Sequence, residues 1–223
     1  MGIYPVINLT LKSAKQPVFD SAYGKMKGEI AEEFRRHQYV LESSKIAEED
    51  KRKFREIAGK EAGYDDYSGS IKFLSKCLYQ ATGKNTVILI DEYDVPLENA
   101  YFRGFYGEMV DFIRSLFESA LKTNDNLQFA VITGCLRISK SSEGRLLETI
   151  FTGLNHLKII SVLDQQYGEH FGFTETEVLQ MMAYYGVENR FPTMKEWYDG
   201  YTFGNTEVYN PWSVINFMYD LVA

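Results

Sequence analysis

Continuous apolar runs alternate with helical patterns over the first two thirds of the chain. Residues 86–90 and 127–136 are short runs of mainly aliphatic and β-branched residues, which is the pattern of parallel strands covered on both faces. Residues 4–11 predict another strand, in which Pro5 is tolerable only near the beginning, and a shorter strand is expected at 157–163. Strands that alternate with helices predict βαβ units, and therefore an α/β fold of three layers with a mostly parallel sheet.

Apolar residues recur at helical spacing in the stretches between these runs. They predict helices from Phe19 to about Tyr39, from about Ala47 to Lys60, from about Ser70 to the turn at Gly83, and a long one ending near Leu121. Ser68 and Ser70 are the expected caps of the third helix. Pro96 predicts an interruption after the run 86–90, followed by a loop rich in aromatic residues and glycine over residues 101–107.

The C-terminal third predicts a small helical region. Thr174 followed by Glu177 is a capping-box pattern, and Asn210 before Pro211 favours the beginning of a final helix. The aromatic residues here are expected to pack in a cluster, with a base-stacking or peptide-binding surface as the alternative: Trp197, Tyr198, Tyr201, Phe203 and Trp212. We therefore expect an α/β core over residues 1–165 and a helical lid or subdomain over residues 166–223.

Composition and charge narrow the class of protein. The 223 residues carry a formal net charge of -7 and no basic stripe of the kind that neutralises nucleic-acid phosphates. The acids and bases of residues 48–53 predict a solvated helix face that neutralises itself. No apolar run approaches the roughly 20 residues of a membrane span. Cys77 and Cys135 lack metal or disulfide spacing and are expected to be core residues in a reducing compartment, which favours the cytoplasm.

Candidate chemistry lies where the apolar run 86–90 ends in Asp91 and Glu92. Ligands of parallel sheets bind beyond the carboxyl ends of the strands, so these acids are positioned to hold a metal ion and to polarise a water molecule. Thr133 and Arg137 follow the next strand, and a hydroxyl and a guanidinium at the same edge suit a phosphate group. The alternative is structural, with capping acids, a capping threonine and a surface arginine.

Several motifs together give the chain a family resemblance. In chain order they are residues 87–97, 132–138, 150–155, 171–174, 197–201 and 209–213. They closely resemble the predicted AAA-ATPase-like family of bacteria, whose members are assigned to the P-loop NTPases. The resemblance implies ATP and Mg²⁺ as cofactors, with Asp91 on the metal at the Walker B position, Glu92 activating the hydrolytic water, Thr133 sensing the γ-phosphate and Arg137 stabilising charge.

Two departures from the family pattern bear on activity. The phosphate-loop pattern Gly-x-x-x-x-Gly-Lys-Ser/Thr is absent from the sequence, and the Gly-Lys-Asn of residues 83–85 lacks its upstream glycine and its hydroxyl. The family places that loop before the strand matched by residues 4–11, so we expect a P-loop-like core without its first strand. Without the N–H donors and lysine of the loop, ATP binding by this chain is expected to be weak or absent. The polar residues 141–149 are a second departure, because family members pass from the arginine segment to the next motif in very few residues. This longer loop is expected to change the orientation of Arg137.

Two other classes of protein stay open. A non-catalytic protein-interaction module would account for the missing loop, because loss of a strand leaves an unpaired sheet edge beside residues 4–11 or 87–90. Self-association or a protein partner is then expected. A metal-dependent nuclease-associated protein would use Asp91 and Glu92 as ligands, although the sequence has no evident Glu-x-Lys partner on a neighbouring strand.

Overall fold

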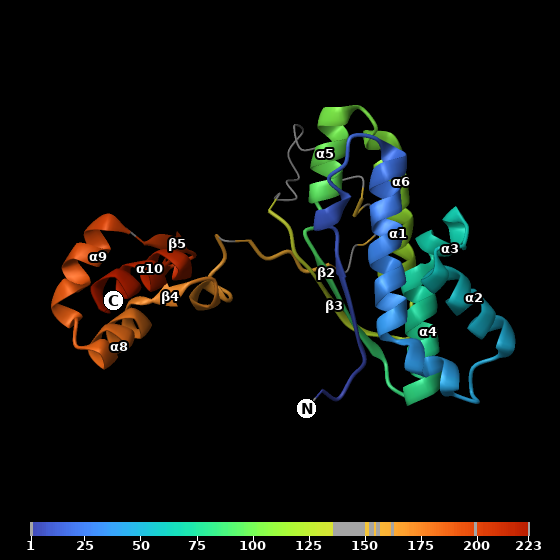
Figure 1. The fold of residues 1–223 in the computed structure, drawn as a ribbon, viewed down its shortest axis with the longest axis horizontal. Helices are drawn as coiled ribbons and strands as arrows, with labels where there is room; N and C mark the ends of the chain where they lie inside the picture. Colours follow the sequence, from blue (N-terminus) through green and yellow to red (C-terminus); the bar gives the residue numbers. More distant parts are fainter. Residues whose placement is uncertain are drawn as a thin grey trace. The chain divides into compact units, whose positions relative to one another are not determined.

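The computed structural model describes residues 2–135, 150–151, 154, 157–161, 163–198 and 200–222. The chain divides into two compact units, residues 1–156 and 157–223, where the sequence led us to expect a division after residue 165. Figure 1 shows the elements of each unit. Arg137 and the segment 141–149 lie outside the described residues.

Over the residues described, the first unit contains a three-stranded parallel sheet with the strand order β1-β2-β3. The strands are β1 (Val6–Thr10), β2 (Thr86–Asp91) and β3 (Leu127–Ile132). The helices are α1 (Phe19–Arg36), α2 (Glu48–Gly59), α3 (Tyr64–Ser68), α4 (Ser70–Thr82), α5 (Val95–Arg103) and α6 (Tyr106–Phe117), with short helical turns at Lys12–Ala14, Gln38–Glu42 and Glu118–Lys122. The expected α/β class and the parallel pairing are confirmed.

One face of this sheet is buried against helices. Ile7 and Leu9 of β1 lie in register with Ile88 and Ile90 of β2, and none of the four exposes more than 2% of its surface. Helices α1, α4 and α6 lie along one side of the sheet (Figure 1), and α1 contacts β1 while α4 contacts β2. The β-branched and aliphatic residues of the two strands therefore form the sheet side of the core.

The opposite face is less covered. On β3, Phe129 and Val131 expose 52% and 46% of their surfaces, so the expectation that residues 127–136 form a core strand is wrong. Strand β3 also ends earlier, at Ile132. In the described residues β2 is the central strand, and the unpaired edges belong to β1 and β3. The expected edge beside residues 87–90 is therefore wrong.

Pro96 lies at the beginning of a helix where the sequence predicted an interruption. It lies in the first turn of α5, where the missing N–H of proline has no helical partner to lose. The predicted loop over residues 101–107 shrinks to a break at Gly104 and Phe105. Gly104 has a φ of 86°, a left-handed conformation that ends α5 before α6 begins at Tyr106.

The two predicted serine caps of α4 donate hydrogen bonds instead. The Ser70 hydroxyl donates to the carbonyl of Tyr67 at 2.7 Å, and the Ser68 hydroxyl donates to the carbonyl of Asp65 at 2.9 Å. Gly69 occupies the N-cap position without a side-chain bond. Both serines thus bond back into α3, a short helix that the sequence did not predict.

In the described residues, the second unit pairs a small antiparallel sheet with three helices. Its elements are β4 (Phe173–Thr174), α8 (Glu175–Tyr185), α9 (Phe191–Trp197), β5 (Tyr201–Phe203), β6 (Thr206–Tyr209) and α10 (Pro211–Val222), with 3₁₀ turns at Gly168–His170 and Glu188–Arg190. The sheet order is β4-β6-β5. Its core contains Val178, Met182, Met194, Tyr209, Val214, Phe217 and Met218. The predicted strand at 157–163 is wrong, since the described residues of that segment form no strand.

Both predicted helix beginnings in this unit are confirmed. The Thr174 hydroxyl accepts the backbone N–H of Glu177, and the Glu177 carboxylate accepts the backbone N–H of Thr174, which completes a capping box. The side-chain oxygen of Asn210 accepts the N–H of Ser213 at 3.3 Å at the beginning of α10. Local chemistry at these two positions was sufficient to specify where each helix begins.

The prediction that the aromatic residues of the second unit pack in a cluster is wrong for most of them. Trp197, Tyr201 and Trp212 expose 60% or more of their surfaces, while Tyr198 packs edge to face on Phe217. Cys77 is buried as expected, and burial raises the pKa of its thiol to about 12. Cys135 is exposed, contrary to expectation. In the described part of the chain, no helix is both long and apolar enough to span a membrane.

Candidate functional site

Asp91 and Thr133 meet at the carboxyl edge of the parallel sheet. Asp91 is the last residue of β2, and Thr133 directly follows β3, which pairs with β2 up to Ile132. The Thr133 hydroxyl donates a hydrogen bond to the Asp91 carboxylate, and both residues are exposed. The two candidates predicted from separate segments therefore lie together at the edge where ligands of parallel sheets bind.

Backbone bonds fix the two strand ends at this point. The N–H of Thr133 donates to the carbonyl of Ile90 at 2.9 Å, and the N–H of Tyr93 donates to the carbonyl of Thr133 at 3.2 Å. Glu92, between Asp91 and Tyr93, has a φ of 54°, in the left-handed region that residues other than glycine rarely adopt. The chain thus turns at Glu92, directly after Asp91, and is tied back to the neighbouring strand.

Tyr93 and Asp94 lie beneath this turn and hold the segment after β3. The N–H of Cys135 donates to the Asp94 carboxylate at 2.8 Å, and both Tyr93 and Asp94 are 4% exposed. A Cβ on Gly134 would lie 2.5 Å from the Tyr93 ring and 2.7 Å from the Asp94 carboxylate, so only glycine fits between them. Burial, with a smaller contribution from Asp94, raises the pKa of the Tyr93 phenol to about 12.

Sequence reasoning did not single out Tyr93, Asp94 or Thr10 for the site. Thr10 ends β1 in register with Asp91, so three oxygen-bearing side chains follow one edge of the sheet. Asp94 was seen as one acid of a run, and only the fold shows that it is buried. A polar residue at the end of each predicted parallel strand was the signal that could have identified Thr10.

The donor set suits a hard cation that keeps most of its water. Magnesium is usually bound by one or two carboxylates together with water and substrate phosphates. Asp91 supplies an exposed carboxylate and Thr133 a neighbouring hydroxyl, which fit that mode. Among the described residues, no group of three or more His, Cys, Asp or Glu side chains could hold a metal ion by itself.

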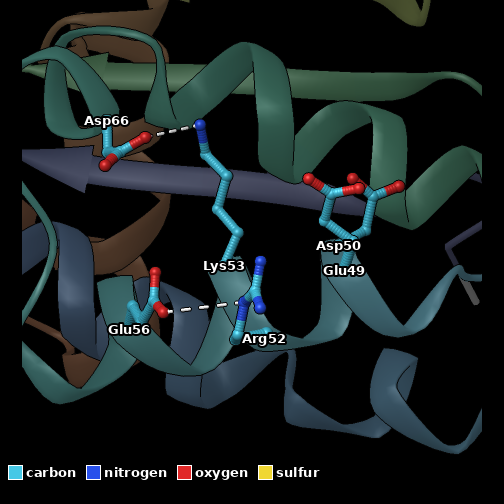
Figure 2. Close-up of a pocket in the computed structure, with 6 residues that line it drawn as sticks. All are labelled: Glu49, Asp50, Arg52, Lys53, Glu56 and Asp66. Atoms are coloured by element: carbon cyan, nitrogen blue, oxygen red, sulfur yellow. Dashed lines mark ion pairs between the residues drawn. The ribbon is translucent and has the colours of Figure 1, made fainter.

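The α2 surface carries a hollow whose charges engage one another. Glu49, Asp50, Arg52, Lys53, Glu56 and Asp66 line it, as Figure 2 shows. Lys53 lies 2.6 Å from Asp66, and Arg52 lies 3.9 Å from Glu56. Asp50 also pairs with Lys76 at 2.7 Å, outside the drawn group. Within the predicted segment 48–53, Lys51 pairs with Glu48 at 2.9 Å. Asp50, Arg52 and Lys53 pair instead with residues outside the segment, so the prediction of a helix face that neutralises itself is confirmed only in part.

An ionic network around the buried Glu33 carboxylate joins α1 to β1. The Glu33 carboxylate accepts the N–H of Asn8 at 2.8 Å and is paired with Arg36, and it lies 3.3 Å from the His37 ring. Burial opposes ionisation of Glu33, but hydrogen bonds from His37, Arg36 and Asn8 outweigh it and lower the pKa of Glu33. The His37 ring also lies 3.0 Å from the carbonyl of Val6. The network anchors the first strand and lies at its amino end, away from Asp91.

Comparison with known proteins supports the motif-based resemblance. The family described as Predicted AAA-ATPase matches residues 1–142. An uncharacterized protein in the vnfD 5' region of Azotobacter chroococcum mcd 1 is 33% identical over 140 residues. That match covers 61% of this chain and 25% of the relative, so the chain spans only about a quarter of that protein. No solved structure matches the chain.

The family match covers the whole parallel sheet and the edge at which Asp91 and Thr133 meet. It ends just after Arg137 and includes both strand ends that carry the candidate residues. The second unit lies outside the matched range. The chain belongs to the predicted AAA-ATPase family.

Proposed function

We propose that the carboxyl edge of the parallel sheet is the magnesium and nucleotide end of an AAA-type ATPase core. The observation that carries this proposal is the hydrogen bond from Thr133 to Asp91, which joins an acid and a hydroxyl at adjacent strand ends. Membership of the predicted AAA-ATPase family supports the same reaction class. Hydrolysis of ATP is the reaction proposed for relatives that carry the phosphate loop.

Each candidate residue has a distinct role in this proposal. Asp91 would coordinate Mg²⁺, which when bound neutralises charge on the β- and γ-phosphates. Glu92 would orient and polarise the attacking water. Thr133 would exchange its bond to Asp91 for one to the γ-phosphate, and Arg137 would stabilise the charge that develops in the transition state.

Binding of ATP by this chain is proposed to be weak. The sequence lacks the phosphate-loop pattern, whose backbone N–H groups and lysine cradle the phosphates. Asp91 and Glu92 place like charge where the polyphosphate would lie, so a metal ion is needed between them and the phosphates. Asp94, the third acid of this run, is buried and bonds to the N–H of Cys135 instead. This chain as it stands would therefore be impaired in hydrolysis.

Isothermal titration of ATP with Mg²⁺ into the full chain tests the proposal. Saturable binding should weaken at least tenfold in Asp91→Asn, because the substitution removes the carboxylate charge that faces the metal. Asp125→Asn is the matched control, since Asp125 is exposed and precedes β3 at the opposite edge of the sheet. Equal binding by both variants, or no binding by any protein, would remove the nucleotide site from this chain.

A second candidate function is supported by the outer edge of β3. In the described part of the chain β3 pairs only with β2, it carries no charged residue, and Phe129 and Val131 are exposed. Natural edge strands usually carry charges or bulges that discourage pairing. We propose that an extended segment of a partner chain adds to this edge, which would make the unit an interaction module.

Light scattering across a concentration series tests this second function. Val131→Lys would place a charge in the exposed row of β3 and should abolish association through that edge. Gln128→Lys adds the same charge on the same strand, at a residue that is already polar. Association that persists unchanged in Val131→Lys would exclude the β3 edge as the interface.

A further inference from the structure

Helix α10 is apolar on two sides. Its inner side carries Val214, Phe217 and Met218, which belong to the core of the second unit. Its outer side carries Trp212, Ile215, Tyr219 and Val222, which expose 77%, 55%, 70% and 50% of their surfaces. A surface helix normally turns a polar face to water, so the outer side lacks the pattern of a face that stays solvated.

The four outer residues form one narrow stripe. At 100° per residue they fall within an arc of about 80° and extend over about 15 Å of the helix axis. Their spacing of three, four and three residues is that of the a and d positions of a coiled coil. Ser213, Asn216 and Asp220 occupy the remaining arc of the helix. We call Trp212, Ile215, Tyr219 and Val222 the α10 stripe.

We infer that the α10 stripe is a self-association surface that packs, antiparallel, against the same stripe of a second copy of this chain. The spacing reads the same in both directions and is centred on residue 217. An antiparallel copy therefore aligns every position, with Trp212 opposite Val222 and Ile215 opposite Tyr219. Such self-complementarity is the requirement of a twofold interface.

Size and charge favour a second copy over other occupants. In the antiparallel pair, each contact joins one aromatic ring to one β-branched side chain. In a parallel pair, Trp212 would face Trp212 of the second copy and Tyr219 would face Tyr219. Antiparallel helices also oppose their dipoles favourably. The helix contains no lysine or arginine, which an anionic membrane surface would need.

The buried area is sufficient for a weak dimer. An aromatic side chain buries about 150–250 Å², so Trp212 and Tyr219 at their exposures supply on the order of 300 Å² per copy. With Ile215 and Val222 from both copies, the total approaches the roughly 1,000 Å² at which specific interfaces begin. We therefore expect association that depends on concentration.

Analytical ultracentrifugation of the full chain over a concentration series tests the inference. Ile215→Lys and Tyr219→Glu should each weaken dimerisation at least tenfold, while Ser213→Lys on the polar arc should leave it unchanged. Circular dichroism checks that each variant keeps its helix content. A wild-type chain that stays monomeric throughout, or dimers unaffected by either stripe variant, would overturn the inference.

Mixing the two stripe variants tests the antiparallel register. In a mixed antiparallel pair Lys faces Glu in one layer, and the native Tyr219 faces the native Ile215 in the other. The mixture should therefore recover at least half of the wild-type dimer at equal total concentration. Failure to recover would exclude the antiparallel arrangement, and dimers lost only in Val131→Lys would assign self-association to β3.

Discussion

The two units of this chain differ in how many of their large aromatic residues they bury. In the first unit Phe34, Phe54, Phe112 and Phe117 are fully buried around one face of a parallel sheet. In the second unit Trp197, Trp212 and Tyr219 are mostly exposed, as are many of its other large apolar residues. A small unit has too little interior to enclose its aromatic residues, so its surface carries what a larger core would bury. Aromatic content alone therefore does not predict a core.

The largest expected contrast is between one buried and one exposed aromatic residue. Phe112 is fully buried, with its ring 5.0 Å from that of Tyr23 and 5.4 Å from that of Tyr64. Phe112→Ala should lower the free energy of unfolding by about 3–5 kcal/mol. Trp212→Ala should change that of the monomer by less than about 0.5 kcal/mol. Urea titrations followed by circular dichroism at low protein concentration measure both, and equal losses would contradict the contrast.

The independence of the two units can be tested inside the smaller core. Met182 is fully buried there, and Met182→Ala should destabilise the second unit by about 2–5 kcal/mol. Trp197 and Trp212 both lie in this unit but are mostly exposed, so their emission changes little on unfolding. Amide hydrogen exchange resolved along the chain reports on each unit separately. Exchange in residues 157–223 should become faster in Met182→Ala while exchange in the first unit stays unchanged. Faster exchange in both units would show one cooperative unit instead.

A third contrast compares a buried with an exposed carboxylate, each of which pairs with a partly exposed cation. Glu33→Gln should cost the first unit about 1.5–3 kcal/mol at pH 7, because Glu33 accepts hydrogen bonds from charged and backbone donors. Glu175→Gln, which breaks the exposed pair with Lys195 in the second unit, should cost much less, because solvent screens this pair. Thermal unfolding of the two variants beside the wild type measures the difference.

The pH dependence of the Glu33 effect follows from the direction of its shift. The pKa of Glu33 is lowered in the folded state, so its contribution is complete above the unfolded value of about 4.3 and is lost as the pH falls through the folded pKa. Stabilities of wild type and Glu33→Gln should converge in that acid range. A constant difference down to pH 3 would show that the charge of Glu33 is not what stabilises the unit.

The smallest contrast concerns how a helix ends in each unit. Lys60 ends α2 at a φ of 67°, and Gly186 ends α8 at a φ of 70°. Lys60→Gly should stabilise the first unit by about 0.5–1 kcal/mol, because glycine adopts this conformation without steric cost. Gly186→Ala should destabilise the second unit by about 1 kcal/mol or more. Calorimetry can resolve the expected gain in stability of Lys60→Gly from the expected loss in Gly186→Ala. A loss of stability in both variants would mean that the Lys60 side chain has a packing role.

Local sequence signals predicted much of the fold. The strand at Val6–Thr10, the strand ending at Asp91 and the capping box at Thr174 each depend on residues close in sequence, and each was predicted. The failures needed tertiary information. Apolar β3 was expected to be covered on both faces, but which strand lies at the edge depends on sheet order, which no single segment encodes.

The sequence predicted where the candidate site residues lie, but not the buried residues that hold them in place. Asp91 and Thr133 were both selected as residues at the ends of parallel strands, and the fold brings them into contact. The buried residues beneath them, Tyr93 and Asp94, were not predicted. They follow Asp91 and Glu92 directly in the sequence, and nothing in that run distinguishes a buried position from a solvent-facing one. Burial of Asp94 against the N–H of Cys135 is a property of two segments 41 positions apart.

The close fit of Gly134 against Tyr93 has a consequence for sequence evolution. A methyl group at position 134 would overlap a buried ring that has little room to move. The Asp94 carboxylate would lie 2.7 Å from the same methyl group. Relatives should therefore carry a larger residue at 134 only where the residues at both 93 and 94 are smaller. Joint variation at these three columns would trace the descent of this sheet edge in proteins whose other motifs have diverged.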